Sequence, residues 1–556
     1  MIQHPPHIHL LGNPLSNFNY LGDLDKNNIQ SLIDAVQGYL KSGLWAIDQS
    51  IAKGLDFLAQ KIFKNNLLFP EYLNAYAEGL GLNPIEIIKQ YIIIEALPSI
   101  NKFIPLLPNL TLGCSSLFTY NAEENSLTHG RILDFPLTNN YLKGERSVLY
   151  EISGHPKIWT LSLAGLPYPS LTSISEHGIT LALHMKYGKN FNLKGHLIFE
   201  LVMGLLFEAQ DQASALKYLK GKSAIGNWGI YLGLPCGDVL AIDIYGEELF
   251  HKIYHMKEQK IIYFNNLPIK KEKLHENYSN GQENYCLMRK KSFSKKIAAF
   301  KKTFPGKIPD AIDVISLLGS PDLASTPIPA PTLVSTKNIS EWNQDTLTLA
   351  SLQIVTLNAS KQQILYTPGS CPKITPNKLL QISNIWKQNG KREMIASNVK
   401  SDPRIAKYRN GMTRFSKAAS FYDQKNYTEA FHHIQIAIEL LDGLYEKNIA
   451  TFYFLVFQYV HFKNKQDHLS LLPQFHSIKD KIPSYLREQA LLFISRLEKL
   501  YFITPSVGID DFSYSDLKNR YLFESKLPRF LLKEMRRLIF PQIGTIDVLY
   551  GYNVKK

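Results

Sequence analysis

The chain has 556 residues, of which 45% are hydrophobic and 20% charged, and its formal net charge is +14. This composition excludes a collagen-like or largely disordered chain, and the length predicts roughly two to four folded units. Four cysteines without a CxxC spacing exclude a disulfide framework and a cysteine-rich metal site, so we expect neither a metal nor another cofactor.

No stretch reaches the roughly 20 apolar residues of a membrane span. The opening MIQHPPHIHLLGNP lacks the pattern of a secretory signal, so we expect a cytoplasmic, reducing location. Residues 377–556 hold 28 Lys and Arg against 17 Asp and Glu, which is +11 of the +14. This charge could attract an anionic membrane or a protein partner. We expect no specific nucleic-acid binding, because no tight basic cluster with interleaved aromatic residues accompanies it.

Helical periodicity dominates residues 28–100, where apolar residues recur at three- and four-residue steps. After Pro108 short β-like runs alternate with turn residues, beginning with a hairpin over 111–135. The later predicted elements are strands within 147–185, a helix over 197–219, strands within 226–266, helices over 286–319 and a closing hairpin over 348–369. Strands, helices and strands again predict a layered α+β domain.

These patterns divide the chain into four parts. They are a helical pro-segment (1–113), a catalytic domain (114–376), a polar connector (377–407) and a helical extension (408–556). The sequence from 412 to 441 has the spacing of one tetratricopeptide-like helix pair. One copy is compatible with a module that binds a protein partner and equally with a purely structural extension.

The segment TLGCSSLFTYNAEENSLTHGRILDF concentrates groups suited to nucleophilic catalysis. A cysteine attacks only as thiolate, so Cys114 needs a base and a positive neighbour. If the chain is cut before Cys114, the new α-amine, with an ordinary pKa of about 7.7–8.0, can take the thiol proton. A glycine at position 113 leaves the preceding carbonyl open to attack. The alternative is a buried structural cysteine behind a strand-initiating glycine.

Arg131 and Asp134 follow one hairpin later. The arginine would stabilise the thiolate, and the aspartate would accept a hydrogen bond from the ammonium form of the α-amine. Positions three apart on a regular strand face opposite sides, so both can reach Cys114 only if the strand bends or a bulge intervenes. Otherwise they form an ordinary charge pair.

The two motifs Gly113-Cys114-Ser115 and Gly130-Arg131-Ile132-Leu133-Asp134-Phe135 resemble the N-terminal-nucleophile cysteine hydrolases. The nearest members are acid ceramidase, N-acylethanolamine acid amidase and isopenicillin N acyltransferase, with choloylglycine hydrolases more distant. The resemblance runs from the helical pro-segment to about Pro376. It implies a four-layer αββα sandwich, self-cleavage before Cys114 and two fragments that stay together. It also implies that Cys114, Arg131 and Asp134 are the nucleophile and its partners.

By the same resemblance, an asparagine in YFNNLP contributes to the oxyanion hole. Asn266 matches best, and Asn265 is the alternative. Arg289 in CLMRKKS is similar to a second arginine of the family. Two departures concern the substrate side of the site: the family's Asn-Glu-x-Gly-Leu is replaced by SEHGI over 175–179, and Cys286 stands where the family has serine.

We therefore expect an autoprocessing cysteine amidohydrolase or acyltransferase that cleaves an N-acyl amide, with a lipid acyl group lodged against apolar helices around 44–63 and 92–107. One alternative is an inactive scaffold whose helical tail binds a protein partner. The other is a papain-like hydrolase, which would need His129 or His177 positioned at the thiol.

Overall fold

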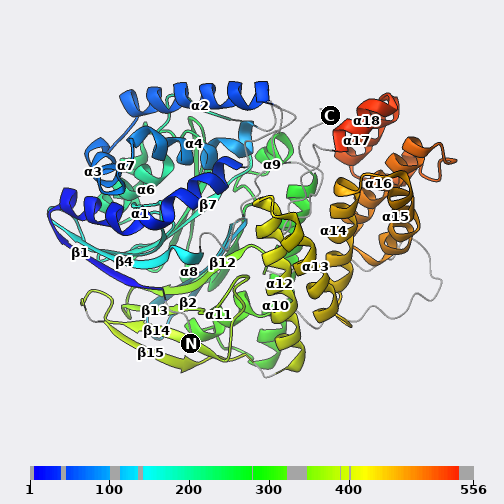
Figure 1. Cartoon of the computed structure of the whole chain (residues 1–556). Coiled ribbons are helices and arrows are strands. Elements are labelled where there is room, and N and C mark those ends of the chain that lie inside the picture. The colour runs from blue at the N-terminus through cyan, green and yellow to red at the C-terminus, as the bar shows by residue number, and fades with distance from the viewer. Residues whose placement is uncertain are drawn as a thin grey trace.

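Two β-sheets lie face to face at the centre of the molecule (Figure 1). The computed structural model describes residues 5–38, 45–100, 113–135, 142–188, 190–278, 280–321, 347–388, 390–399 and 402–536. The first sheet has eight strands, which in spatial order are β1 (His7–Gly12), β4 (Glu145–Ile152), β5 (Ile158–Leu163), β6 (Thr172–Ser175), β7 (Thr180–Met185), β8 (Asn227–Gly233), β9 (Val239–Tyr245) and β10 (Glu248–Tyr254).

The second sheet has seven strands and carries the motif segment. In spatial order they are β11 (Ile261–Phe264), β2 (Gly113–Asn121), β3 (Ser126–Asp134), β12 (Ser351–Asn358), β13 (Gln363–Tyr366), β14 (Lys378–Ser383) and β15 (Lys391–Ala396). The predicted hairpin over 111–135 is β2 paired antiparallel with β3, and the predicted closing hairpin is β12 with β13.

Alternation along the strands separates two kinds of core. In β4, Leu149 packs between the sheets with Trp159 and Val355. Its neighbours Val148 and Tyr150 face the other way, into a larger core shared with helices. Because successive strand residues point to opposite faces, a strand buried on both sides reads as a continuous apolar run.

Helices cover the outer face of the first sheet (Figure 1). They are α1 (Pro14–Gly38), α2 (Trp45–Asn65), α3 (Pro70–Leu80), α4 (Pro84–Ile100), α6 (Ile198–Glu208) and α7 (Gln212–Leu219). Helices α1 and α3 approach closely at Gly22 and Gly79, where a Cβ atom would overlap the backbone of the opposite helix. The helices of the second sheet's side are α8 (Met256–Gln259), α9 (Glu272–Asn277), α10 (Asn280–Thr303) and α11 (Ala311–Gly319). The architecture is therefore α+β, with four layers in the order αββα.

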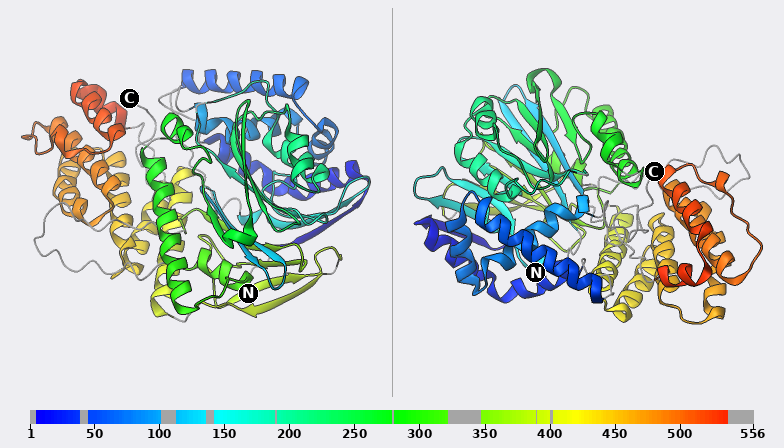
Figure 2. Two further views of the ribbon diagram at one scale, coloured as in Figure 1. Left: turned by 180° about the vertical axis from the view of Figure 1, so that it is seen from behind. Right: turned by 90° about the horizontal axis from the view of Figure 1, so that it is seen from above.

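The remaining chain is all-helical and stands to one side of the layers (Figure 2). It consists of α12 (Pro403–Asp423), α13 (Tyr427–Leu440), α14 (Glu446–His461), α15 (Lys465–Ile478), η2 (Lys479–Lys481), α16 (Ser484–Tyr501), η3 (Ile509–Asp511), α17 (Ser515–Lys526) and α18 (Arg529–Met535). Consecutive helices from α12 to α16 pack on one another, and their core is continuous with that of α10 and α11. No helix in the described ranges combines the length and apolarity needed to cross a bilayer.

The structure corrects two boundaries. Residues 378–396, predicted as part of a polar connector, form β14 and β15, which extend the second sheet beyond β13. No side chain of β15 is fully buried, so its polar sequence KREMIA suits an edge strand. The N-terminal segment, predicted to be helical, begins with strand β1, which pairs parallel with β4.

Candidate active site

Cys114 is the second residue of β2 and is only 2% exposed. It pairs in register with Leu133 of β3, and Gly113 pairs with Asp134. A Cβ atom at position 113 would overlap the Tyr285 hydroxyl and the Asp134 carboxylate. Glycine is therefore required before Cys114 by a close approach of side chains, and the Gly113–Cys114 bond lies directly beside the buried carboxylate.

The thiol side of β2 faces Arg131. The guanidinium Nη2 lies 3.5 Å from the Cys114 Sγ, and the Sγ lies 3.7 Å from the carbonyl oxygen of Leu183 in β7. Burial raises the pKa of the thiol, while Arg131 and the Met185 backbone N–H act against that rise. Burial thus favours the protonated thiol, beside a cation that favours the ionised form.

Asp134 lies on the opposite side of the same strand, toward α10. Its Oδ2 accepts a hydrogen bond of 3.2 Å from Arg289, and its Oδ1 accepts one of 2.6 Å from the Ser351 hydroxyl. Burial raises the pKa of this carboxyl, and the Arg289 charge opposes the rise. A β-bulge does occur beside Asp134, but it lies in β12, between Ser351 and Gln353. The strand β3 itself stays regular, so Asp134 does not share the thiol's face.

Arg289 ties the second side of the site together. From α10 it donates to the Cys114 carbonyl oxygen at 3.1 Å and to the Asn266 Oδ1 at 2.6 Å, besides its ion pair with Asp134. Its side chain is fully buried, and the guanidinium stacks over the Tyr285 ring. A short motif match in the sequence therefore corresponds to a central contact in the structure.

Asn266 is the asparagine that contacts Cys114. Its Oδ1 accepts the Cys114 backbone N–H at 2.9 Å, and its Nδ2 donates to the Met185 carbonyl at 2.8 Å. Asn265 instead forms a turn, with its Nδ2 on the Cys286 carbonyl and its Oδ1 accepting the Leu267 N–H. An oxyanion hole needs a hydrogen-bond donor, whereas here the side-chain oxygen of Asn266 faces Cys114 and accepts its backbone N–H. The structure therefore does not show the expected oxyanion role of Asn266.

The sequence analysis missed a buried charge cluster that holds the Asn266 loop. Lys186 and Asp243 are fully buried and 3.2 Å apart. The Lys186 Nζ donates to the Tyr231 hydroxyl at 2.7 Å and to the Leu267 carbonyl at 2.6 Å, and Asp243 accepts the Ile269 N–H at 2.7 Å. The available signal was a lysine directly after the apolar strand ITLALHM, where burial is unusual for its type.

The two histidines of the papain-like alternative lie elsewhere. The His129 ring nitrogens contact Thr180 and Ser116 between the sheets, and burial lowers the pKa of this imidazole well below its ordinary value. His177 lies in the turn between β6 and β7. Each ring nitrogen of His129 is therefore engaged with a hydroxyl rather than with the thiol.

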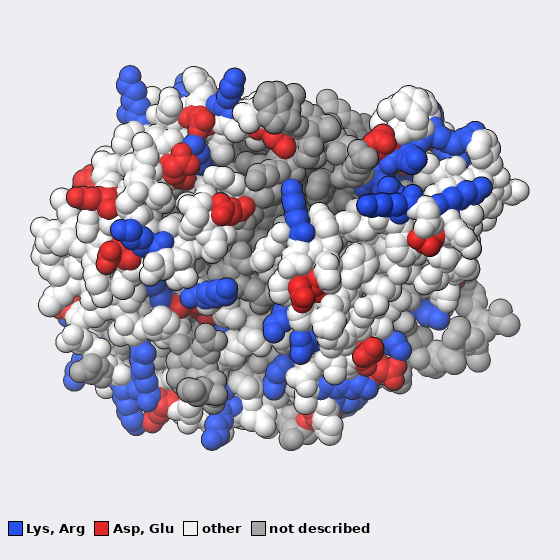
Figure 3. All heavy atoms as spheres, in the orientation of Figure 1, with Lys and Arg blue, Asp and Glu red and all other residues white. Residues whose placement is uncertain are grey.

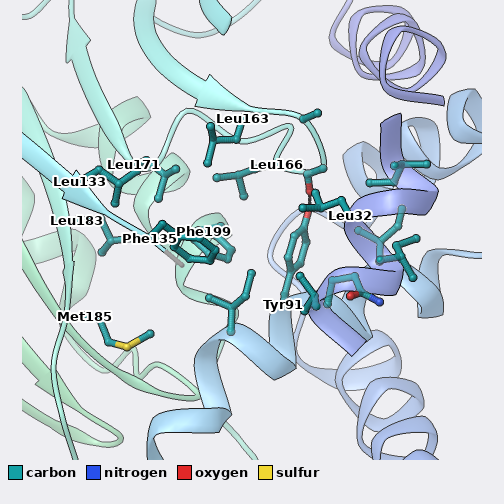
Figure 4. Close-up of a pocket in the computed structure, with 18 of the residues that line it drawn as sticks. Leu32, Tyr91, Leu133, Phe135, Leu163, Leu166, Leu171, Leu183, Met185 and Phe199 are labelled. Carbon is teal, nitrogen blue, oxygen red and sulfur yellow. Dashed lines mark hydrogen bonds between the residues drawn. The ribbon is translucent and has the colours of Figure 1, made fainter. Parts of the chain in front are cut away.

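Cys114 is one of the residues that line an apolar pocket. Figure 4 shows this pocket with most of its other lining side chains. The empty space within its bounds is roughly 800 Å³, a volume that includes open solvent. Strand residues such as Leu133 and Leu183 form one side, and Leu32 and Tyr91 approach from the helices. The lining helices are α1, α4 and, through Phe199, α6. In the stretch 44–63, expected to contribute, residues 45–63 belong to α2, which packs on α4 and whose described side chains do not line the pocket; residues 101–107 lie outside the described residues. The N-terminal segment thus supplies much of the pocket wall.

No family model and no curated protein matches this chain. Among solved structures, the chain is similar to a Caenorhabditis elegans ortholog of N-acylethanolamine-hydrolyzing acid amidase (13% identity, 38% of this chain and 88% of that one, TM-score 0.30). It is also similar to penicillin V acylase from Agrobacterium tumefaciens (14% identity, 51% of this chain and 91% of that one, TM-score 0.30). The chain is similar as well to a variant of conjugated bile acid hydrolase from Clostridium perfringens, with 10% identity over 52% of this chain and 99% of that one and a TM-score of 0.34. At these low identities and TM-scores, the contacts of Cys114 are the stronger guide to function.

Proposed function

We propose that this chain is a self-activating cysteine amidohydrolase or acyltransferase that uses Cys114 as nucleophile on an N-acyl amide with a long apolar acyl group. The observation that supports this most is the thiol itself, buried on the wall of an apolar pocket, 3.5 Å from a guanidinium and with its backbone nitrogen held by Asn266. A purely structural cysteine needs neither of these polar contacts.

The first reaction would be cleavage of the Gly113–Cys114 bond. The Cys114 Sγ attacks the Gly113 carbonyl carbon, the C–N bond breaks, and the thiol proton passes to the departing nitrogen. Water then hydrolyses the thioester, leaving a carboxylate on Gly113 and a free α-amine on Cys114. The close packing of Asp134 and Tyr285 around Gly113 would fix the orientation of this bond.

In the cut chain the α-amine would serve as the base. It takes the thiol proton, the thiolate attacks the amide carbonyl, and the amine product leaves with a proton. Water or a second amine then releases the acyl group from sulfur. Asn266 Oδ1, which accepts the backbone N–H in the uncut chain, is suited to hold the α-amine in either protonation state.

Donors for the developing oxyanion are available on the thiol side. The Met185 backbone N–H is close enough to the thiol to lower its pKa. The Nε and Nη1 of Arg131 are buried and find no hydrogen-bond acceptor among the described residues. Preorganised donors in a water-poor site stabilise a negative charge strongly.

The pocket lining supports an apolar acyl group. Its walls are built mainly from Leu, Ile, Val and aromatic side chains. Among the described lining residues, Gln90 carries the one amide side chain. Burying each CH₂ group of an acyl chain contributes about 0.8 kcal/mol. Such a pocket would favour long chains over short or charged ones.

Intact-mass measurement of the purified protein tests the proposal. The wild-type chain should yield two fragments that separate at Gly113–Cys114, and Cys114→Ala should stay whole; Cys371→Ala, at another buried cysteine, is the control and should be cut normally. The cut enzyme should release free fatty acid from an N-acyl amide. A wild-type chain that never separates and whose Cys114 resists alkylation would refute the proposal and favour a non-catalytic scaffold.

A further inference from the structure

A surface patch at the end of the helical extension combines exposed apolar and basic side chains. We call it the α18 patch, and its members are Phe502, Lys526, Arg529, Phe530, Leu531 and Lys533. Phe502 and Phe530 are 77% and 66% exposed, and Leu531 is 40% exposed. Isolated exposed apolar residues are common, but three together on a short helix and its neighbour are not.

Phe502 has an unfavourable backbone conformation. It follows the last residue of α16 with φ 60° and ψ 36°, a left-handed conformation that usually selects glycine at a helix end. A bulky residue there is strained, and its ring is also left in water. The contact that the ring does make is with the Arg529 guanidinium, which lies over its face. The folded state alone gives little reason for phenylalanine at this site.

Helix α18 presents its apolar residues outward. Leu532 is buried and anchors the helix, whereas Phe530 and Leu531 project away from the core. This arrangement is the reverse of an ordinary surface helix, whose apolar side chains face inward.

The charge around these rings is mainly positive. Lys526, Arg529 and Lys533 are exposed, and Glu534 is the exposed acidic residue of α18. Figure 3 shows Lys and Arg side chains gathered over the end of the helical extension, where α17 and α18 lie. Cations that surround exposed rings complement a surface with anionic headgroups above an apolar interior.

We propose that the α18 patch docks on an anionic lipid membrane. Phe502, Phe530 and Leu531 enter the interfacial region of the bilayer, while Lys526, Arg529 and Lys533 contact headgroup phosphates. A nucleic acid would satisfy the same cations, but it offers no apolar layer for Leu531 and Phe530. This inference concerns the helical extension alone and holds whatever Cys114 catalyses.

Vesicle co-sedimentation of the full chain tests the proposal. At low salt the protein should bind phosphatidylcholine vesicles that contain phosphatidylserine, and bind pure phosphatidylcholine vesicles much more weakly. Replacing Lys526, Arg529 and Lys533 together with glutamine should weaken binding by roughly fivefold per charge removed. The double variant F530S/L531S should weaken it by roughly tenfold or more. Phe57→Ser, which removes an equally exposed ring from α2, is the matched control and should bind as wild type.

Phe502→Gly separates docking from folding. Glycine relieves the left-handed strain, so the melting temperature should rise or stay unchanged while vesicle binding falls. Binding of the triple glutamine variant and of F530S/L531S equal to that of the wild type would overturn the proposal. So would failure of the wild type to bind anionic vesicles, and a preference for a single-stranded oligonucleotide over the vesicles would assign the patch to nucleic acid instead.

Discussion

Arg131 and Asp134, three residues apart on β3, lie on opposite sides of the second sheet, and only Arg131 reaches the Cys114 thiol. Asp134 acts from the other side through Arg289, which also holds the Cys114 carbonyl oxygen and Asn266. The two residues of one motif therefore have separable tasks. We expect Arg131 to favour the ionised form of the sulfur, and Asp134 to position, through Arg289, the backbone that carries it.

Replacing Arg131 with glutamine should raise the pKa of the Cys114 thiol, because the cation that favours the thiolate is lost. At pH 8 we expect alkylation of Cys114 in the cut enzyme to slow by roughly tenfold or more. The measurement is the labelling rate of the Cys114 peptide as a function of pH. Arg404→Gln, at an exposed arginine, is the control; an unchanged pH profile in Arg131→Gln would argue against this role.

Replacing Asp134 with alanine should leave the buried Arg289 without its carboxylate partner. Breaking such a pair costs about 3–5 kcal/mol, so the free energy of unfolding should fall and self-cleavage should slow. Ser351→Ala, which removes a single hydrogen bond to the same carboxylate, should cost about 1 kcal/mol. Denaturant unfolding and cleavage time courses provide the comparison. Equal effects of the two substitutions would contradict the central place given to the ion pair.

The Lys186–Asp243 pair should hold Asn266 in place without touching substrate. Lys186→Met leaves Asp243 buried and unpaired, so stability should fall by about 3–5 kcal/mol. The double variant K186M/D243L should regain much of that stability. Its kcat should nevertheless stay low with KM little changed, because Leu267 and Ile269 have lost the groups that fix their loop. Full recovery of kcat in the double variant would show that the Lys186–Asp243 pair contributes to stability and not to the positioning of Asn266.

A larger side chain in the pocket should shorten the acyl group that the enzyme accepts. Ile33→Trp fills space on the α1 side of the pocket, and we expect kcat/KM to fall roughly tenfold or more for long-chain amides and little for short ones. Leu24→Trp changes an exposed position on the same helix and should leave the preference unaltered. The ratio of hydrolysis rates for a series of chain lengths is the measurement.

Glu95 should make the stability of the N-terminal segment depend on pH. Burial raises the pKa of this carboxyl from 4.5 to about 8. Because the folded state binds the proton more tightly, its stabilising contribution is fully present below pH 4.5 and is lost as the pH rises to about 8. Glu95→Gln should therefore melt higher than wild type at pH 8.5 and similarly at pH 4.5. An identical difference at both pH values would exclude this ionisation as the cause.

Local patterns in the sequence determined much of the architecture. The motif hairpin, the closing hairpin and the α-helical tail follow from short-range periodicity and turn residues, which need no distant partner. Within residues 378–396, strand β15 escaped this reasoning because an edge strand is partly exposed and its polar side chains resemble those of a linker. Strand β1 was missed for a related reason, since its pairing partner β4 lies more than a hundred residues away.

At the site, the sequence by itself determined which residues to expect there: Cys114 with Arg131 and Asp134 in a hairpin, and an asparagine and an arginine further along. Only the tertiary structure decided how they meet. It placed Arg131 and Asp134 on opposite sides, selected Asn266 over Asn265, and brought Lys186 and Asp243 behind the loop. Side-chain direction and long-range packing decide such contacts, because a side chain can contact only the elements that pack against its side of the strand or helix. The spacing of residues along the chain does not specify which elements those are.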